Sequence, residues 1–280
     1  MQKIKLFTDS TSDLSEKILK EHNIDVVPLN VIFDDQAFKD GKDIKTDKMY
    51  KMVEEKDKLP KTSGTPPKDF VDAFKPYIEE GYEIIYIGLS SELSATYQNA
   101  KLASQSLDGK IHVVDSKNLC VGIGILVLKA ADFIKEGYSS EQVVENVENL
   151  VEKVEMQFVI NTLDYLHKGG RCTGVQNFVG TMLKIRPVVK VVDGGMILAQ
   201  KTRGKFKKAL QNMLKNALKD KEQIRKDKIV VAHSMNKEGA DYLKEQLEKE
   251  LEGEIIMTEA ECVISSHCGP KTVGLAYLKK

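Results

Sequence analysis

The chain has 280 residues, and its 42 lysines and arginines are balanced by 42 aspartates and glutamates. A chain of this length can bury a sizeable core, and it favours two domains over one. The zero net charge excludes a global field that would recruit nucleic acid or an anionic membrane. The longest apolar run, residues 119–128, is about half of the roughly 20 residues that span a bilayer. This run therefore predicts a buried helix and no membrane-spanning segment.

The N-terminus and the cysteines favour a cytoplasmic protein. MQKIKLFTD enters a strand-like run directly, without the long apolar segment or the cleavage site of a secretion signal. The four cysteines form no CxxC pair, so we expect reduced thiols at Cys120, Cys172, Cys262 and Cys268. A zinc site built from Cys262, His267 and Cys268 would lack a paired-ligand spacing and a clear fourth ligand. We therefore predict no metal site.

Strand-like and helix-like segments alternate through the first half of the chain. KIKLFT leads into a helix expected from about Leu14, and residues 26–33 form a second expected strand. Residues 83–89 and 111–115 are apolar on both faces, which is typical of parallel strands covered by helices on both sides. Helices are expected at about 94–106, 119–136 and 139–154. This order predicts a doubly wound parallel α/β domain over residues 1–155.

The pattern changes in the second half of the chain. Asp193-Gly194 lies between two apolar runs and is a strong signal for a two-residue β-hairpin. Amphipathic helices are expected at about 204–219 and 237–251, and strands at KIVVAHS, near 254–265 and near 272–278. We therefore predict that residues 156–280 form an α+β domain with a largely antiparallel sheet.

Two loops carry more hydroxyl groups than helix capping requires. GLSSELSATYQNA places four of them around a helix start, at Ser90, Ser91, Ser94 and Thr96. A proline-rich loop, TSGTPP, adds Thr62, Ser63 and Thr65, and it lacks the GKS or GKT of a nucleotide-binding P-loop. Hydroxyls and helix amides beyond the carboxyl ends of parallel strands can hold a carboxylate or a phosphate.

The stretch FTDSTSDL permits two interpretations. Asp13 followed by Glu16 resembles a capping box at a helix start, with Ser12 as the competing cap. Asp9, at the end of the first strand, could instead be the nucleophile of an aspartyl-phosphate enzyme, which would also need a lysine and distal acidic metal ligands. Residues 34–43 could supply acids, although their sequence is typical of a solvated turn. An autonomous phosphotransferase or phosphatase that uses Asp9 therefore stays as an alternative.

Charged residues of the second half suggest two further features. LHKGGRCTG places Arg171 on a glycine-rich turn, SSHCGP places His267 near the C-terminus, and both side chains suit an acidic group held between domains. Residues 201–228 contain eleven basic side chains against three acidic ones, whereas residues 241–261 contain eight acidic against two basic. Phe206 is the only aromatic of the basic segment, so nucleic-acid stacking is poorly supported. A lipid-independent module for protein docking remains an alternative.

Taken in order, the motifs resemble those of the DegV family of bacterial fatty-acid-binding proteins. They are FTDSTSDL, TSGTPP, GLSSELSATYQNA, VVDSKN, LDYLHKGGR, KIRPVVKVVDG, KTRGKFKKAL and SSHCGPKTVGLAY. The resemblance implies an α/β domain followed by an α+β domain, with one long-chain fatty acid in an internal apolar tunnel. It also implies a separate fatty acid kinase that phosphorylates the bound carboxylate for phospholipid synthesis. The chain itself is then a substrate-presenting protein without catalytic residues or a cofactor.

The resemblance also implies which residues hold the ligand. Thr62 and Ser94 correspond to carboxylate-binding positions with His267 nearby, and Arg171 lines the opening. Ser63 and Ser91 join them as neighbouring ligand-binding hydroxyls.

The chain departs from the usual family pattern near the end, where Cys268 and Lys271 replace the Thr and the second Gly of HTGPG. It also reads SATY instead of SGTY at residues 94–97, and Gly64-Thr65-Pro66 where a Gln-Pro step is usual. The change at Cys268 removes a hydroxyl beside His267, and Lys271 adds a charge near the expected mouth of the site.

Overall fold

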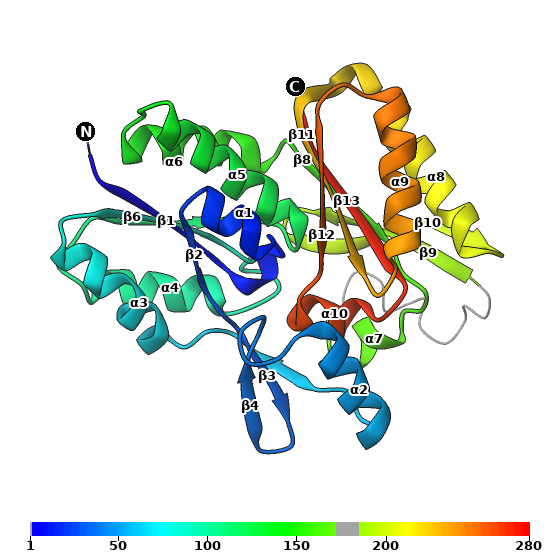
Figure 1. Cartoon of the computed structure of the whole chain (residues 1–280), viewed down its shortest axis with the longest axis horizontal. Helices are drawn as coiled ribbons and strands as arrows, with labels where there is room; N and C mark the ends of the chain where they lie inside the picture. The colour runs from blue at the N-terminus through cyan, green and yellow to red at the C-terminus, as the bar shows by residue number, and fades with distance from the viewer. Residues whose placement is uncertain (1, 172–184) are drawn as a thin grey trace.

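The computed structural model describes residues 2–171 and 185–280, which are organised around two main sheets (Figure 1). The first sheet is parallel, in the order β2-β1-β6-β7, with β1 at Ile4–Asp9, β2 at Ile24–Val27, β6 at Glu83–Gly88 and β7 at Ile111–Asp115. The second has the order β10-β9-β8-β13-β11-β12. Its strands are β8 (Val154–Val159), β9 (Ile185–Val192), β10 (Gly195–Arg203), β11 (Ile224–Ser234), β12 (Glu254–Glu259) and β13 (Thr272–Lys279). Every described pair in this sheet is antiparallel except β11 with β12. The predicted fold class is therefore confirmed.

Helices cover both faces of the parallel sheet, because side chains of a strand alternate between its faces. Phe7 and Tyr86 pack on one face against α3 (Pro67–Glu79) and α4 (Thr96–Gln105). Leu6 and Ile85 pack on the other face, against α5 (Val121–Lys135) and α6 (Ser140–Val151). Figure 1 shows the two helix pairs on opposite sides of the sheet. This arrangement explains why both faces of these strands are apolar in the sequence.

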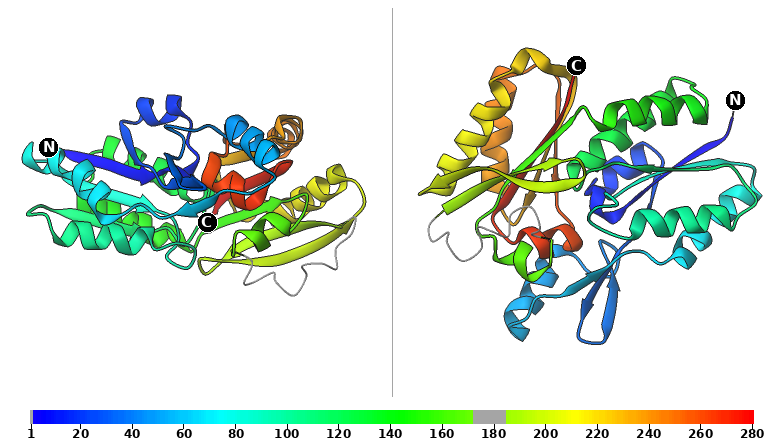
Figure 2. Two further views of the ribbon diagram at one scale, coloured as in Figure 1. Left: turned by 90° about the horizontal axis from the view of Figure 1, so that it is seen from below. Right: turned by 180° about the vertical axis from the view of Figure 1, so that it is seen from behind.

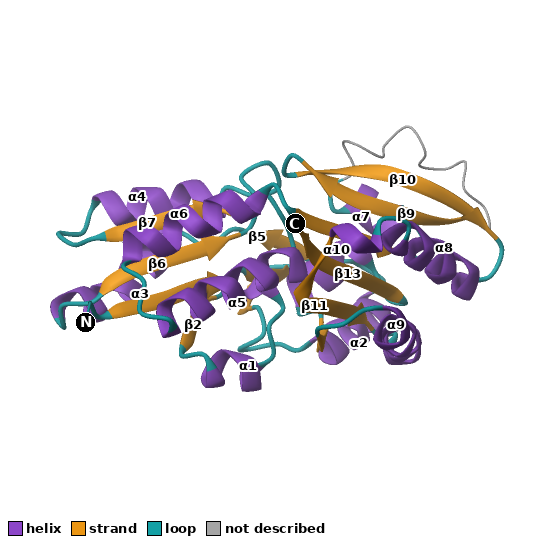
Figure 3. Cartoon of the chain, turned by 90° about the horizontal axis from the view of Figure 1, so that it is seen from above, coloured by secondary structure: helices purple, strands orange, loops and turns teal. Residues whose placement is uncertain are grey.

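Helix α5 lies between the two sheets (Figure 3). Its apolar side chains from Val121 to Leu128 are fully buried, and they share one core with Phe158, Val230 and Ala276 of the second sheet. The buried helix predicted from residues 119–128 is thus confirmed. The opposite face of the second sheet is covered by α8 (Phe206–Leu218) and α9 (Lys237–Glu250), which were both expected. No described helix is long and apolar enough to cross a membrane.

A small third sheet, in the order β4-β3-β5, corrects one prediction. Residues 26–33 do not form a single strand, because the chain leaves the parallel sheet at Pro28, which has no backbone N–H to donate. β3 (Asn30–Phe33) instead pairs with β4 (Gln36–Lys39) and β5 (Lys61–Ser63). Along the chain, the helix α2 (Thr46–Lys56) lies between β4 and β5.

The helix expected from about Leu14 begins later. A short 3-10 turn covers residues 10–12, and Asp13 then adopts a left-handed conformation with φ 53°. Helix α1 (Glu16–Glu21) begins after Ser15, whose hydroxyl accepts a hydrogen bond from the Ile18 N–H at 3.4 Å. The capping box predicted at Asp13 and Glu16 is therefore wrong.

The second half agrees with the prediction except near the C-terminus. Asp193 and Gly194 have φ of 49° and 82° and close the expected β9–β10 hairpin. The strand expected near 254–265 ends at Glu259 and is followed by a helix, α10 (Cys262–Cys268). Short helices also occur at α7 (Asp164–Lys168) and at Lys221–Gln223. Along the chain, the second sheet begins with strand β8 at Val154. The domain boundary between residues 155 and 156 stays a prediction.

Candidate functional site

A cavity lies where the carboxyl ends of the parallel strands face the second sheet. In the parallel sheet, β1 lies between β2 and β6. The chain therefore turns in opposite directions after β1 and after β6, and ligands of open α/β sheets bind at such points. The wall is mainly apolar and includes Leu29, Leu89, Leu119, Met156, Phe158 and Met196.

Polar side chains of the wall come from several distant segments of the chain. Thr62 on β5 and His267 on α10 form a hydrogen bond of 2.9 Å between Oγ1 and Nε2. Burial lowers the pKa of His267 to about 4, and the charge of Arg171 acts in the same direction. The imidazole is therefore neutral at pH 7. Its Nδ1 is buried without a hydrogen-bond partner among the described residues.

Gly169 positions the His267 ring by having no side chain. A Cβ at this residue would lie 2.2 Å from the His267 Nδ1, closer than real Cβ contacts occur. The glycine ends α7, so the GG dipeptide brings this turn against α10. The sequence predicted Arg171 as a site residue on this turn, whereas the role of Gly169 was not predicted. The adjacent glycines were the available signal.

Ser94 lies beside Thr96 and Gly64. The Ser94 Oγ is 2.8 Å from the Thr96 Oγ1 and accepts the Thr96 N–H at 3.2 Å. A Cβ at Gly64 would lie 2.7 Å from the Thr96 hydroxyl and 3.1 Å from that of Ser94. Gly64 therefore lets the β5 loop, with Thr62, lie directly against the hydroxyls of the α4 loop.

Arg171 joins the same group from the second half of the chain. It donates from Nη1 to the Gly169 carbonyl at 2.9 Å and from Nε to the Leu93 carbonyl at 3.4 Å. Among the described residues no carboxylate forms an ion pair with it. The guanidinium lies half-buried at the cavity wall, with its charge available to an anion.

The remaining predicted hydroxyls have other partners. Ser63 lies at the wall, but its Oγ accepts a hydrogen bond from the Asn30 side chain at 3.2 Å. Ser91 is exposed, and the structure does not bring it to the cavity, so its assignment as a ligand-binding residue is not supported. Ser90 donates to the Gly194 carbonyl at 2.8 Å, which holds the tip of the β9–β10 hairpin against the first half of the chain (Figure 2).

The two departures from the family pattern near the C-terminus have different surroundings. Cys268 is buried and lines the cavity, where the replaced hydroxyl would lie. Lys271 is exposed and does not line this cavity. Cys120, Cys262 and Cys268 are free thiols as predicted, and Cys172 lies outside the described residues.

Asp9 does not face the cavity as a free nucleophile. The carboxylate is fully buried, and its Oδ1 accepts hydrogen bonds from the backbone and hydroxyl of Thr11 at 2.9 and 2.5 Å. Its Oδ2 accepts from the Tyr86 hydroxyl at 2.7 Å and from the Leu89 N–H at 2.8 Å. The side chain therefore ties the carboxyl ends of β1 and β6 together. Burial raises its pKa despite these donors.

Comparison with known proteins agrees with the motifs. The model of the DegV family, a family of proteins described as uncharacterised, matches residues 3–280. The chain belongs to the DegV family. A DegV domain-containing protein of Clostridium acetobutylicum is 35% identical over 281 residues, with all of both chains covered.

Solved structures of DegV proteins share the whole fold. A DegV family protein from Thermus thermophilus, studied for fatty acid binding, is 33% identical with a TM-score of 0.93, and 100% of each chain is covered. A DegV lipid-binding protein from Thermotoga maritima is 30% identical with a TM-score of 0.88 and 99% of each chain covered. The Fatty Acid Kinase (Fak) B3 protein of Streptococcus pneumoniae, loaded with linoleic acid, is 27% identical with a TM-score of 0.87 over 100% of each chain.

Proposed function

We propose that this DegV protein binds one long-chain fatty acid in the cavity and presents its carboxylate to a fatty acid kinase. The carboxylate lies at Thr62 and Ser94, with His267 beside them and Arg171 at the opening. The acyl tail lies along the apolar wall. Fatty acid binding by the similar DegV proteins supports the ligand class, and the likeness to the Fak B3 protein supports the kinase partner.

The observation that carries the proposal is an apolar cavity beside a positive charge that pairs with no carboxylate among the described residues. Met156, Phe158 and Leu119 offer a tail no hydrogen bonds, whereas Arg171 offers an anion a guanidinium that no described carboxylate neutralises. A ligand that satisfies both is apolar over most of its length and acidic at one end. A long-chain fatty acid has this chemistry.

Tail burial supplies most of the affinity. Removing about 14 methylenes from water at roughly 0.8 kcal/mol each contributes on the order of 11 kcal/mol, before the cost of ordering the ligand is subtracted. The head group therefore needs only modest stabilisation. Neutral donors at Thr62 and Ser94 can hold the carboxylate without a close ion pair, which would make its oxygens less nucleophilic toward an incoming phosphoryl group.

Native mass spectrometry of the purified protein tests the binding step. We expect a co-purifying C14 to C18 acid, and we expect delipidated protein to bind palmitate or oleate again. Protein that carries no lipid and binds neither acid would refute the proposal. Among saturated acids that still fit the cavity, each methylene should strengthen binding by up to about fourfold, the equivalent of about 0.8 kcal/mol.

The presentation step has its own test. Arg171→Ala should retain bound lipid, since tail burial dominates, but it should reduce acyl-phosphate formation by an added fatty acid kinase. Phosphorylation at the wild-type rate would refute the role of Arg171. The exposed Ser91→Ala variant is the matched control, because Ser91 lies on the same side of the molecule but does not line the cavity.

The alternative functions have less support. Asp9, the nucleophile that an autonomous phosphotransferase would need, is buried and has four hydrogen-bond donors of its own. The charged segments proposed for docking partly pair with each other, as in Lys221 with Glu250 at 3.3 Å and Lys226 with Glu252 at 2.8 Å. The cytoplasmic location stays a prediction.

A further inference from the structure

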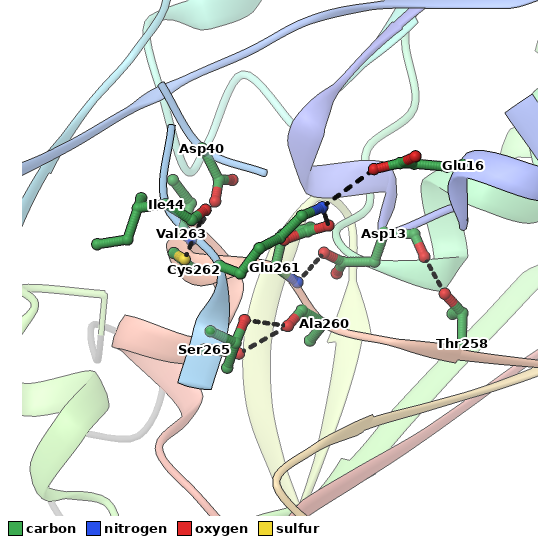
Figure 4. A network of polar contacts seen from close by, with 12 residues as sticks. Asp13, Glu16, Asp40, Ile44, Thr258, Ala260, Glu261, Cys262, Val263 and Ser265 are labelled. Carbon is green, nitrogen blue, oxygen red and sulfur yellow. Dashed lines mark hydrogen bonds and ion pairs between the residues drawn. The ribbon is translucent and has the colours of Figure 1, made fainter. Parts of the chain in front are cut away.

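A group of potential metal ligands lies at the start of α10, in the part of the molecule drawn in Figure 4. One carboxylate oxygen of Asp40, one of Glu261 and the Sγ of Cys262 all lie within 4.8 Å of one another. Asp40 comes from the turn after β4, far from α10 in sequence. The sequence suggested a solvated turn there, but only 2% of the Asp40 surface is exposed, so this expectation is wrong for Asp40.

The negative charge of Asp40 has no counter-charge in the described structure. Its Oδ1 accepts the Val263 N–H at 3.2 Å, whereas its Oδ2 is buried without a hydrogen-bond partner. Lys45 is the nearby cation, but its ammonium pairs with Glu261 at 2.8 Å and with Glu16 at 3.6 Å. Burial raises the pKa of Asp40 to about 7. A buried carboxylate in this situation is costly unless a proton or a cation compensates for it.

We propose that Asp40, Glu261 and Cys262 bind one divalent cation of borderline softness, of which Zn2+ is the type. Carboxylate oxygens bind zinc at ~2.1 Å and cysteine sulfur at ~2.3 Å, so in the tetrahedral geometry of zinc two ligand atoms lie ~3.5 Å apart. Side-chain movements of up to ~1 Å would bring these three donors into that range. A sulfur donor favours zinc over Mg2+ or Ca2+, which take oxygen ligands. On binding, the Cys262 thiol releases its proton to solvent.

Two neighbours keep this arrangement in place. Gly41 has φ 71°, and a Cβ there would lie 3.1 Å from the Glu261 carboxyl carbon, so a side chain would push Glu261 away from its position. Asp13 accepts the Glu261 N–H at 2.8 Å, and its other carboxylate oxygen is also buried without a partner in the described structure. The ion would fasten the turn after β4 to the first turn of α10. His267 lies in the last turn of the same helix, so the ion would also steady the wall of the cavity.

The sequence predicted no metal site, and the proposed site differs from that prediction. The proposal does not depend on the proposed lipid function. The ligands differ from the set considered there, since His267 and Cys268 lie at the other end of α10 from Cys262.

Zinc binding by the metal-stripped full-length protein tests the proposal. We expect about one zinc per chain by plasma mass spectrometry after dialysis, together with a higher Tm in added Zn2+. Cobalt should replace zinc and show the absorption band of a thiolate-cobalt bond. Cys262→Ser and Asp40→Asn should each weaken zinc binding at least tenfold, whereas Cys268→Ser and the exposed Asp35→Asn should bind as the wild type does.

Several results would overturn the site. They are wild-type protein without stoichiometric zinc, a cobalt complex without the thiolate band, and unchanged zinc binding in folded Cys262→Ser. If these variants do not fold, Glu261→Gln and the cobalt spectrum of the wild type still decide the question. A wild type that binds no metal and an Asp40→Asn variant with raised Tm would identify a proton, and not a metal, as the compensating charge.

Discussion

Two strand-end regions of this protein are both rich in hydroxyls, but they differ in what their polar groups contact. In residues 9–13, after β1, Asp9 has a full set of donors and Ser10 accepts the Leu29 N–H at 3.1 Å. In the loops that carry Thr62 and Ser94, the hydroxyls lie on the wall of a cavity. Polar composition is therefore common to both kinds of loop, whereas only the hydroxyls of the candidate site lie beside a cavity.

The largest effect should come from Asp9→Ala, a change in the region after β1. It removes the acceptor of four buried hydrogen bonds, and each buried donor left unpaired costs roughly 1–3 kcal/mol. We expect a loss of about 4 kcal/mol or more in the free energy of unfolding, measured by urea denaturation. Protein that remains folded should still bind lipid. Full stability together with lost turnover of a phosphorylated substrate would instead revive the enzyme hypothesis.

Low pH should reduce the stability of the folded protein through His267, which lies at the cavity wall. Its pKa is about 4 in the folded protein, whereas an unfolded chain protonates histidine near pH 6.5. Between these pH values the unfolded state binds a proton that the folded state does not bind. The stabilisation that His267 contributes therefore decreases as the pH falls from 6.5 to 4, and it is complete above pH 6.5. The contribution of His267 is at most about 3 kcal/mol.

Urea denaturation at pH 7 and pH 4.5 measures this contribution. The wild type should lose more stability than His267→Gln between the two pH values. Equal losses in both proteins would mean that His267 does not titrate as its burial implies.

A smaller effect is expected from the double variant Thr62→Val and Ser94→Ala. Hydrogen bonds to a charged group contribute about 1.5–3 kcal/mol each, and lost capping costs about 1 kcal/mol. Fatty acid affinity, measured by calorimetry, should fall by tenfold or more, while stability changes little. Ser91→Ala should leave affinity unchanged. A double variant that unfolds readily but binds lipid normally would mean that these hydroxyls, like Asp9, stabilise the fold and do not bind the ligand.

The smallest effect should follow charge reversal in the basic segment, Lys205→Glu with Lys208→Glu. Both side chains belong to the start of α8 on the far face of the second sheet, away from the cavity wall. Lipid affinity should stay within about twofold of the wild type. A large loss of partner binding that needs no lipid would favour the docking-module hypothesis.

Local pattern predicted much of the fold. Apolar strands, the buried run at residues 119–128 and the Asp193-Gly194 hairpin are all confirmed, because periodicity and left-handed turn residues act over a few positions. Pattern did not reveal the break at Pro28 or the helix α10 after Glu259. Both depend on which distant segment offers hydrogen bonds: β3 pairs with β5, and α10 receives the Asp40 carboxylate at its first turn.

The candidate site follows the same division. The residue pattern alone predicted an α/β half, an α+β half and a site with hydroxyls, a histidine and an arginine, since side-chain chemistry is local information. The resemblance implied that His267 lies near Thr62, but their hydrogen bond, the exposure of Ser91 and the burial of Asp9 depend on the folded chain. Contacts between residues 205 positions apart depend on how the two sheets pack around α5, and no local preference encodes that packing.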